Sequence, residues 1–357
     1  MAKLGEVCLL KAGKFVSAND ISPEYNKGLY PCFGGNGIRG YVADYTHDGE
    51  FPLIGRQGAL CGNVNLASGK FHATEHAVVV QPKIEMNVHW LYYALNAMNL
   101  GQYATGAAQP GLAVSKLETL SIEIPNISEQ NKIAQTLYKV EQLVNFRKQQ
   151  LAKLDELVKA RFVEKSKEWQ AVPGQLNEFL EDITYGFTNP MPDAEEGPWK
   201  VTAKDVVNGH INILTARKTT NEAFERLTNK SKPRKGDVLL TKDGTLGRVA
   251  VVDVENLCVN QSVAVMRCNN KIYPEFLAMI LQMPEYQRKL LEDSGGGTIK
   301  HLYITKVDKM LISVPDFVIQ KDLLMFAKRV EQQKQTARQS LEKLEQLKKA
   351  LMQEYFG

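Results

Sequence analysis

An internal duplication in this chain of 357 residues constrains its fold more than any other feature. Residues 53–60 (LIGRQGAL) are repeated 186 positions later at 239–246 (LLTKDGTL), and a β-branched run follows each copy, at 77–80 and 263–265. A strand-like segment, a glycine turn and a second strand-like segment therefore occur twice in the same order. We predict two similar modules in tandem.

A long polar helix is predicted behind each module. Residues 122–125 (IEIP) return as 312–315 (ISVP), and neither 128–168 nor 317–356 contains a glycine or proline. Positions spaced alternately four and three apart are mostly apolar: Ile133, Leu137, Val140, Val144, Arg147, Leu151, Leu154 and Val158, then Leu323, Ala327, Val330, Lys334, Ala337, Leu341, Leu344, Lys348 and Leu351. This spacing is typical of a coiled-coil seam, and each helix would be about 58 Å long.

Each seam needs an apolar partner, because a lone helix of this composition is only marginally stable in water. The two helices match in length, so the simplest arrangement is an antiparallel coiled coil within the chain, with pseudo-two-fold symmetry. Such a coil would hold the modules roughly one to two turns of B-DNA apart, which suits a target read as two half-sites with an unread gap. The alternative is that each helix packs on its own module.

The predicted fold class is α+β, with two tandem mixed α/β domains that are each followed by a long helix. We call residues 1–127 the first module and 169–316 the second module; the helices occupy 128–168 and 317–357. The first module is expected to contain short strands at 51–54, 63–66 and 76–80 and a buried helix at 88–98, and a helix at 276–280 is expected in the second.

The composition indicates a soluble globular protein, with 44% hydrophobic and 24% charged residues. No apolar run approaches the length of about 18 residues that a membrane span needs, and the N-terminus does not resemble a signal peptide. Five widely spaced cysteines without a C-x-x-C pair indicate neither a disulfide framework nor a zinc site. We therefore expect a cytoplasmic protein with reduced thiols.

The net charge of +4 lies mainly on the helices. Residues 128–168 contain nine Lys/Arg against six Asp/Glu, and residues 317–357 contain eight against five, so the remainder of the chain carries −2. A protein that binds nucleic acid tightly on its own usually has a stronger basic surface. We predict that the chain alone binds DNA weakly.

Motifs of catalysis are missing from the sequence. No G-x-x-x-x-G-K-[ST] phosphate loop is present, and residues 189–192 (NPMP) lack the second adjacent proline and the aromatic residue of an amino-methyltransferase motif. His72 and His76 are four residues apart but do not form an H-E-x-x-H motif, so we interpret them as polar residues of the surface or core. We predict no catalytic residue, no metal site and no cofactor, with an enzyme of unrecognised site as an alternative.

The end of each module carries the most specific motifs. The first copy reads TGAAQPGL (105–112), SKL (115–117) and EQNKIA (129–134), and the second reads GGTIK (296–300), TKV (305–307), Pro315 and Gln320. The helices end in LDELVKARF (154–162) and LEQLKKALM (344–352). With the two-copy layout of the whole chain, these motifs resemble the specificity subunit of a type I restriction-modification system. Asn126 and Asp316 depart from the second proline that the family often has.

The resemblance implies that each module is a target-recognition domain that reads one half of a bipartite site in double-stranded DNA. It also implies that the helices set the gap and dock two adenine methyltransferase subunits, that restriction subunits join the complex, and that this chain is not itself an enzyme. Two alternatives remain. One is the specificity subunit of a related system with cleavage and methylation on one partner chain, and the other is a coiled-coil adaptor that joins two protein ligands without DNA.

Reading of bases needs hydrogen-bonding side chains on loops where glycine lets the backbone approach phosphate. The duplicated turns meet this need at equivalent positions, with Arg56, Gln57 and Gly58 in the first module and Lys242, Asp243 and Gly244 in the second. The second-rank candidates for DNA contact are Asn36, Arg39, Asn63, Gln109, Arg217, Lys218, Arg248, Lys300 and His301. For every candidate, an ordinary solvated surface position is the alternative.

Partner subunits are expected to contact the outer helix faces and the helix ends. The candidates are Arg161, Phe162, Met352, Tyr355 and Phe356, because exposed aromatic rings at these ends would be costly unless they were covered. The alternative is that these side chains pack within the chain.

Overall fold

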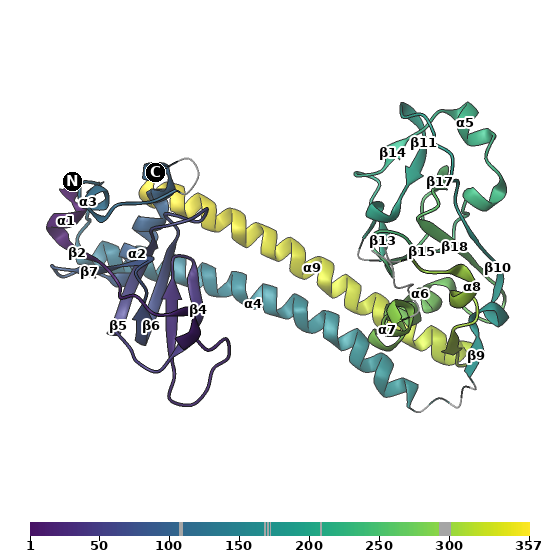
Figure 1. Cartoon of the computed structure of the whole chain (residues 1–357), viewed down its shortest axis with the longest axis horizontal. Helices are drawn as coiled ribbons and strands as arrows, with labels where there is room; N and C mark the ends of the chain where they lie inside the picture. Colours follow the sequence, from purple (N-terminus) through teal and green to yellow (C-terminus); the bar gives the residue numbers. More distant parts are fainter. Residues whose placement is uncertain (107–109, 168, 170, 172, 208, 293–300) are drawn as a thin grey trace. The chain divides into compact units, whose positions relative to one another are not determined.

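The computed structural model describes residues 1–106, 110–167, 169, 171, 173–207, 209–292 and 301–357 (Figure 1). By their contacts they form two compact units, residues 1–151 with 336–357 and residues 152–335. Each unit thus contains one module, the start of the long helix that follows it, and the end of the other long helix. None of the described helices has the length and apolarity required to cross a membrane.

The first module is built on a six-stranded sheet with the order β2-β7-β5-β6-β3-β4. Its strands are β2 (Cys8–Ala12), β3 (Tyr30–Gly34), β4 (Gly37–Val42), β5 (His47–Gly55), β6 (Val64–Ala73) and β7 (Ala77–Pro82). The short strands β1 (Ala2–Lys3) and β8 (Ser121–Ile122) pair with each other, and the helices are α1 (Leu4–Val7), α2 (Val88–Ala97) and α3 (Val114–Glu118). The predicted strands and the predicted helix at 88–98 are confirmed, but β5 begins four residues earlier than predicted and β6 ends seven residues later.

The second module has a four-stranded sheet with the order β10-β18-β15-β16. Its strands are β10 (Leu180–Tyr185), β15 (Val238–Thr241), β16 (Val249–Val251) and β18 (Val263–Cys268). A separate sheet contains β11 (Ala194–Val201), β14 (Arg217–Lys218) and β17 (Leu257–Val259), and the short strands are β9 (Pro173–Gln175), β12 (Val206–Val207), β13 (His210–Ile211) and β19 (Leu311–Ser313). The helices are α5 (Asn221–Glu225), α6 (Pro274–Gln282), α7 (Pro284–Glu292) and α8 (Ile304–Val307).

The duplication extends to the pairing register of the strands. Leu53 of β5 faces Val79 of β7, and Leu239 of β15 faces Val265 of β18, so both partners are displaced by the same 186 positions. The order β2-β7-β5-β6 in one sheet corresponds to β10-β18-β15-β16 in the other. Burial on both faces explains why β5 and β15 contain continuous apolar runs rather than alternating ones. The modules differ by the hairpin β3–β4 in the first and the three-stranded sheet in the second.

The two long helices, α4 (Ile127–Ser166) and α9 (Phe317–Phe356), pair in opposite directions. Residues further along α4 contact residues earlier in α9. The contacts are Lys348 Nζ to Glu141 Oε1 (2.7 Å), Arg147 Nε to Ser340 Oγ (3.1 Å) and Lys334 Nζ to Asp155 Oδ1 (2.6 Å). Burial lowers the pKa of Lys334, but its bonds to Asp155 and Glu331 outweigh that effect and raise the pKa above its usual value. The predicted antiparallel coiled coil is confirmed.

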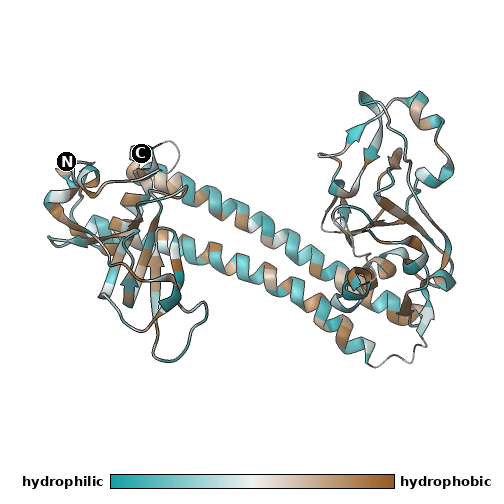
Figure 2. Ribbon diagram, in the orientation of Figure 1, coloured by the Kyte–Doolittle hydropathy of each residue, from teal (hydrophilic) through white to brown (hydrophobic). Residues whose placement is uncertain are grey.

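The predicted seam is the buried face of these helices. Eight of its apolar members are buried, namely Ile133, Leu137, Val140, Val144 and Leu154 on α4 and Leu323, Val330 and Ala337 on α9. The other six are half-buried: Leu151, Val158, Ala327, Leu341, Leu344 and Leu351. Figure 2 shows brown and teal segments alternating along both ribbons, as expected for helices with one apolar side. Apolar spacing alone therefore located both helices and their contact faces.

A buried glutamine ties each long helix to its own module. Gln130 on α4 accepts a hydrogen bond from Asn87 N–H (2.9 Å) and donates to Pro125 O (2.8 Å). Gln320 on α9 is 1% exposed; it accepts from Tyr273 N–H (3.0 Å) and donates to Pro315 O (2.9 Å). The same side chain thus satisfies the same backbone groups in both copies, at the point where a helix begins.

Replacement of Gln320 by alanine is expected to lower the free energy of unfolding by about 1–3 kcal/mol, because buried backbone groups would lose their partners. Denaturant titration of the whole chain would measure this loss. Gln335→Ala, at an exposed position on the same helix, is the control and should change stability by no more than about 0.5 kcal/mol. Equal stability of the two variants would contradict the role given to Gln320.

Candidate nucleic-acid interface

The two duplicated turns occupy the same place in their sheets. Residues 56–58 (the first loop) directly follow β5, and residues 242–244 (the second loop) directly follow β15. Gly58 and Gly244 both have left-handed backbone, with φ of +84° and +79°, and no other part of the chain lies within 4 Å of the position that a Cβ would take. Glycine suits such a turn, and the open space beside it leaves both loops accessible.

Three chain segments converge at each loop through the same backbone hydrogen bonds. Each loop lies between two other segments of its module. One segment precedes the neighbouring strand of the sheet, which is β7 or β18, and the other precedes the short helix α3 or α8. The bonds are Arg56 N–H to His76 O (3.0 Å) and Leu112 N–H to Arg56 O (2.9 Å) in the first module, and Lys242 N–H to Ser262 O (2.8 Å) and Leu302 N–H to Lys242 O (2.9 Å) in the second. The backbone of this surface is therefore duplicated while its side chains differ.

In the second module the structure brings Lys242, Asp243 and His301 together. Asp243 lies 2.9 Å from Lys242 Nζ and 2.6 Å from His301 Nδ1. Burial by itself would raise the pKa of Asp243, but the bonds to His301 and Lys242 outweigh burial and hold the pKa below its usual value. Asp243 therefore stays ionised at neutral pH and holds the two basic side chains at this end of the sheet.

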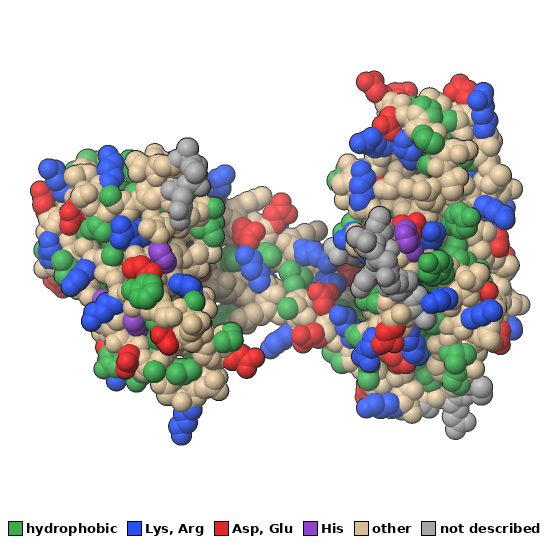
Figure 3. Space-filling view, in the orientation of Figure 1, with side chains coloured by type: hydrophobic (Ala, Val, Ile, Leu, Met, Phe, Trp, Pro, Cys, Tyr) green, Lys and Arg blue, Asp and Glu red, His purple; other side chains and the backbone are tan. Residues whose placement is uncertain are grey.

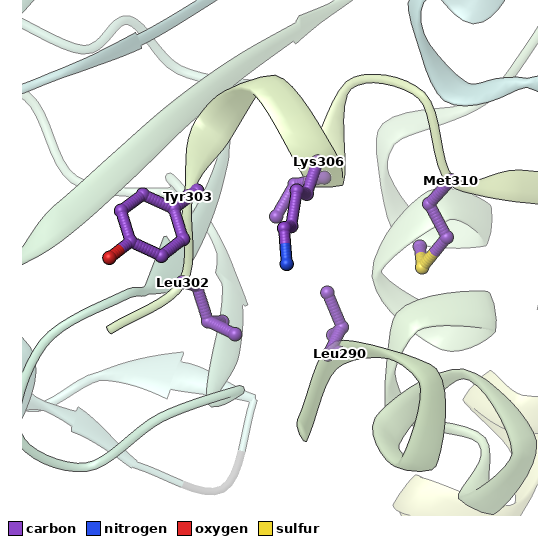
Figure 4. A pocket seen from close by; sticks show the side chains of 6 residues that line it. Leu290, Leu302, Tyr303, Lys306 and Met310 are labelled. Atoms are coloured by element: carbon purple, nitrogen blue, oxygen red, sulfur yellow. The ribbon is translucent and has the colours of Figure 1, made fainter. Parts of the chain in front are cut away.

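Leu302 packs in the core and so fixes the segment of chain that includes the neighbouring residue His301. Figure 4 shows Leu302, Tyr303, Lys306 and Met310 around a hollow that is also lined by Leu290 and Val307. The hollow has no room for a water molecule, and Leu302 is only 3% exposed. This is core packing beneath α8 rather than a ligand pocket, and it fixes the position of His301.

The first module brings together a different group of predicted residues. Asn63 Nδ2 donates to Asn36 Oδ1 (2.8 Å), and the turn that contains Asn36 lies against the first loop, since Gly35 approaches Gly55 and Gln57. Arg39 is exposed beside this turn. Asn63 in the first module corresponds to Arg248 in the second. In each case the backbone carbonyl of this residue accepts a hydrogen bond from the backbone N–H of the last residue of the preceding strand, β5 or β15.

Arg217 and Lys218 lie on β14, in the other sheet of the second module. Arg217 Nη1 donates to Asp193 Oδ2 (2.7 Å), and Lys218 Nζ lies 4.7 Å from the centre of the Trp199 ring. Bonds from Lys200 and Arg217 hold the pKa of the Asp193 carboxyl below its usual value. These residues thus belong to a different sheet from the strand that leads into the second loop. Gln109 and Lys300 lie outside the described residues.

Residues 74–76 and 260–262 run beside the two loops and are candidates for DNA contact that were not predicted from the sequence. Thr74, Glu75 and His76 precede β7, and their counterparts Asn260, Gln261 and Ser262 precede β18. The only signal in the sequence is their position directly before a β-branched run. Strand order, which brings β7 next to β5 and β18 next to β15, puts them at the loops.

Among the aromatic residues predicted at the partner interface, Phe162 is buried, and Tyr355 and Phe356 are partly buried. Phe162 is 4% exposed, and its ring centre lies 6.2 Å from that of Phe276. Met352, Tyr355 and Phe356 pack against the core of the first module, with the Phe356 ring 6.4 Å from Trp90. Phe162 is therefore a core residue of the second module, which corrects its assignment to a partner contact, whereas Met352, Tyr355 and Phe356 keep part of their surface exposed and stay predicted partner contacts. Arg161 is half-buried and lies 2.8 Å from Glu164.

Basic side chains do not gather in a single patch on the visible face. Figure 3 shows Lys and Arg interspersed with Asp and Glu over both units. Groups of three or more potential metal ligands do not occur among the residues that the structure describes. The feature that marks the two modules as candidate DNA-binding domains is therefore the pair of equivalent loops, residues 56–58 and 242–244.

Comparison with known proteins gives consistent results. The family described as "Type I restriction modification DNA specificity domain" matches residues 1–156 and 191–346. The specificity subunit of the type I restriction enzyme EcoprrI of Escherichia coli is 53% identical over 143 residues, which are 40% of this chain and 36% of that protein. A putative type I restriction enzyme specificity subunit of Haemophilus influenzae is 29% identical over 303 residues, covering 81% of this chain and 76% of that protein.

Solved structures share the fold. The crystal structure of a type I restriction-modification S subunit from M. genitalium superposes with a TM-score of 0.64 and 17% identity, covering 98% of this chain and 94% of that one. A chain from a study of complex assembly and conformational transition of the type I system gives a TM-score of 0.59 at 16% identity, covering 99% and 96%.

Proposed function

Because the chain belongs to the family of type I restriction-modification DNA specificity proteins, we propose that it is the DNA-reading subunit of such a complex. Residues 1–127 and 169–316 are its recognition domains, each reading one half of a split site in double-stranded DNA. Residues 128–168 and 317–357 are the helices that separate the two half-sites. The chain itself carries out no chemistry and works in the cytoplasm with free thiols.

One observation carries this proposal: the same backbone arrangement presents different side chains in the two modules. Arg56 and Gln57 stand where Lys242 and Asp243 stand in the second copy, beside equivalent hydrogen bonds. Arg and Lys suit guanine, Gln suits adenine, and Asp accepts from cytosine. A shared scaffold with different base-edge chemistry is what recognition of two different half-sites requires.

The exposed side of α4 supports docking of protein partners. Five large apolar side chains on this helix are 44–59% exposed: Tyr138, Leu143, Phe146, Leu157 and Val163. Tyr138 also lines a groove of about 390 Å³ with Tyr92, Tyr93 and Ile38. Large apolar side chains left exposed on a helix favour that helix as a place where protein partners bind. The proposed partners are two adenine methyltransferase subunits and the restriction subunits.

Methylation sequencing of the host genome, with the gene intact and deleted, tests this function. The expected result is N6-methyladenine at one split motif with a fixed unread gap, lost on deletion. An unchanged methylome in cells that express the gene and its methyltransferase would contradict the proposal and favour the protein adaptor. For the purified chain alone we expect weak DNA binding, because its modules are not basic.

A further inference from the structure

We propose that residues 74–76 and 260–262 form a second base-reading segment in each module, in which Glu75 and Gln261 read equivalent positions of the two half-sites. This inference rests on the proposed function and adds specificity-determining residues to it.

Both segments form the same turn at the end of the sheet. Ala77 N–H donates to Thr74 O (3.0 Å), and Val263 N–H donates to Asn260 O (3.1 Å). Glu75 and Gln261 each occupy the second position of these four-residue turns, where Glu75 is half-exposed and Gln261 is exposed. The next residue in each turn accepts a backbone hydrogen bond from the adjoining loop, at Arg56 or Lys242. Each turn therefore lies alongside a loop that carries the first-rank candidates for DNA contact.

In the first module, buried polar atoms without partners concentrate at this place. Among the described residues, six buried side-chain nitrogen or oxygen atoms have no hydrogen-bond partner, and five of them belong to Arg56 and to residues 72–76. Thr74 Oγ1 is one of them, on a residue that is 0% exposed. Polar groups that lack partners destabilise a folded chain, so their concentration marks a polar region beside the first loop whose hydrogen bonding is incomplete within the chain.

Glu75 is held so that only one of its carboxylate oxygens has a partner. Its Oε1 lies 3.1 Å from His76 Nε2, whereas Oε2 is buried and has no partner, so the half-buried side chain must rotate before Oε2 can meet a base. A carboxylate only accepts hydrogen bonds, and the amino groups of cytosine and adenine are the donors in the major groove. Glu75 is therefore suited to a base that presents an amino group.

Gln261 offers a different chemistry at the equivalent position. The second turn is closed by Asn260, whose Oδ1 accepts from Ser262 N–H (3.2 Å) and Ser262 Oγ (2.5 Å), while Gln261 is exposed. An amide both donates and accepts, which matches the N6 and N7 edge of adenine. One turn geometry thus presents an acceptor in one module and a paired donor and acceptor in the other.

The test exchanges these two side chains in the complex assembled with its methyltransferase. Glu75→Gln and Gln261→Glu each preserve side-chain shape, and methylation rates are measured on duplexes with single base changes at every position of the wild-type site. We expect each variant to change base preference about 5- to 150-fold at one position of one half-site. The two variants should act on opposite half-sites.

Glu85→Gln is the matched control, because it makes the same change at an exposed carboxylate beyond the other end of β7. If both exchange variants keep the wild-type preference at every position, or if either affects both half-sites equally, the inference is overturned. Should Glu75→Gln lower the melting temperature, Gln261→Glu at its exposed site still decides the question. If the wild-type complex methylates no split site, the proposed function itself fails.

Discussion

Replacement of Gly186 by alanine is expected to disrupt the second module and to lower its free energy of unfolding by more than about 3 kcal/mol. A Cβ on Gly186 would lie 1.7 Å from Val259 O and 2.3 Å from Val259 C. The neighbour is backbone, and it is held in place because Phe187 N–H donates to Val259 O (3.0 Å) and Gly186 N–H donates to Val263 O (3.3 Å). The overlap therefore cannot be relieved by rotation of a side chain.

Gly13 provides the same test in the first module. A Cβ there would lie 2.0 Å from Ala73 O, at the position that corresponds to Val259. Each substitution should therefore damage one module, which limited proteolysis of the purified chain would locate. In the assembled complex, each variant should lose recognition of one half-site.

Gly236→Ala separates steric overlap from backbone strain. Gly236 has φ of +91°, but nothing lies within 4 Å of the position of its Cβ. Alanine at this position should cost only about 1–2 kcal/mol, through the left-handed backbone alone. If Gly186→Ala unfolds at the same denaturant concentration as Gly236→Ala, the close approach of the two backbones is not what makes glycine necessary.

Replacement of Lys242 by alanine is expected to weaken recognition of one half-site by about 1–3 kcal/mol. The substitution removes a donor from the second loop and leaves Asp243 with one basic partner fewer, so negative charge is less well compensated where DNA would approach. Methylation rates of the assembled complex on duplexes altered in either half-site would measure the effect. Rates should become insensitive to base changes in one half-site only.

Two further variants make this result interpretable. Arg56→Ala changes the equivalent position of the first loop and should relax the opposite half-site. Lys235→Ala removes the same charge from an exposed residue before β15, at the other end of that strand, and should leave base preference unchanged. Equal loss at both half-sites in Lys242→Ala would contradict the assignment of one module to one half-site.

Local patterns in the sequence determined the duplication, the three strands predicted in the first module, the long helices and their contact faces, but not β2, β3, β4 or the three-stranded sheet of the second module. Apolar residues such as Leu137 and Val330 recur at helical spacing, and that spacing fixes which side of a helix is buried. The equivalence of Arg56 and Lys242 could also be predicted, because both follow the same strand in aligned copies. Such features depend on residues that are near neighbours in the chain.

Tertiary structure decided which distant segments share a surface. Strand pairing brings His76 next to Arg56 and Ser262 next to Lys242. Further along the chain, the segment that precedes α8 comes back to the second loop and brings His301 to Asp243. Packing likewise decided what Phe162 contacts, since its ring is covered by the core of the second module and not by a partner subunit. The spacing of apolar residues predicts only which face of a helix or strand is buried. Which residue packs against that face depends on the strand order and on the path of the chain in three dimensions. The sequence therefore determined the two-copy scaffold, and tertiary contacts alone assembled its candidate reading surfaces.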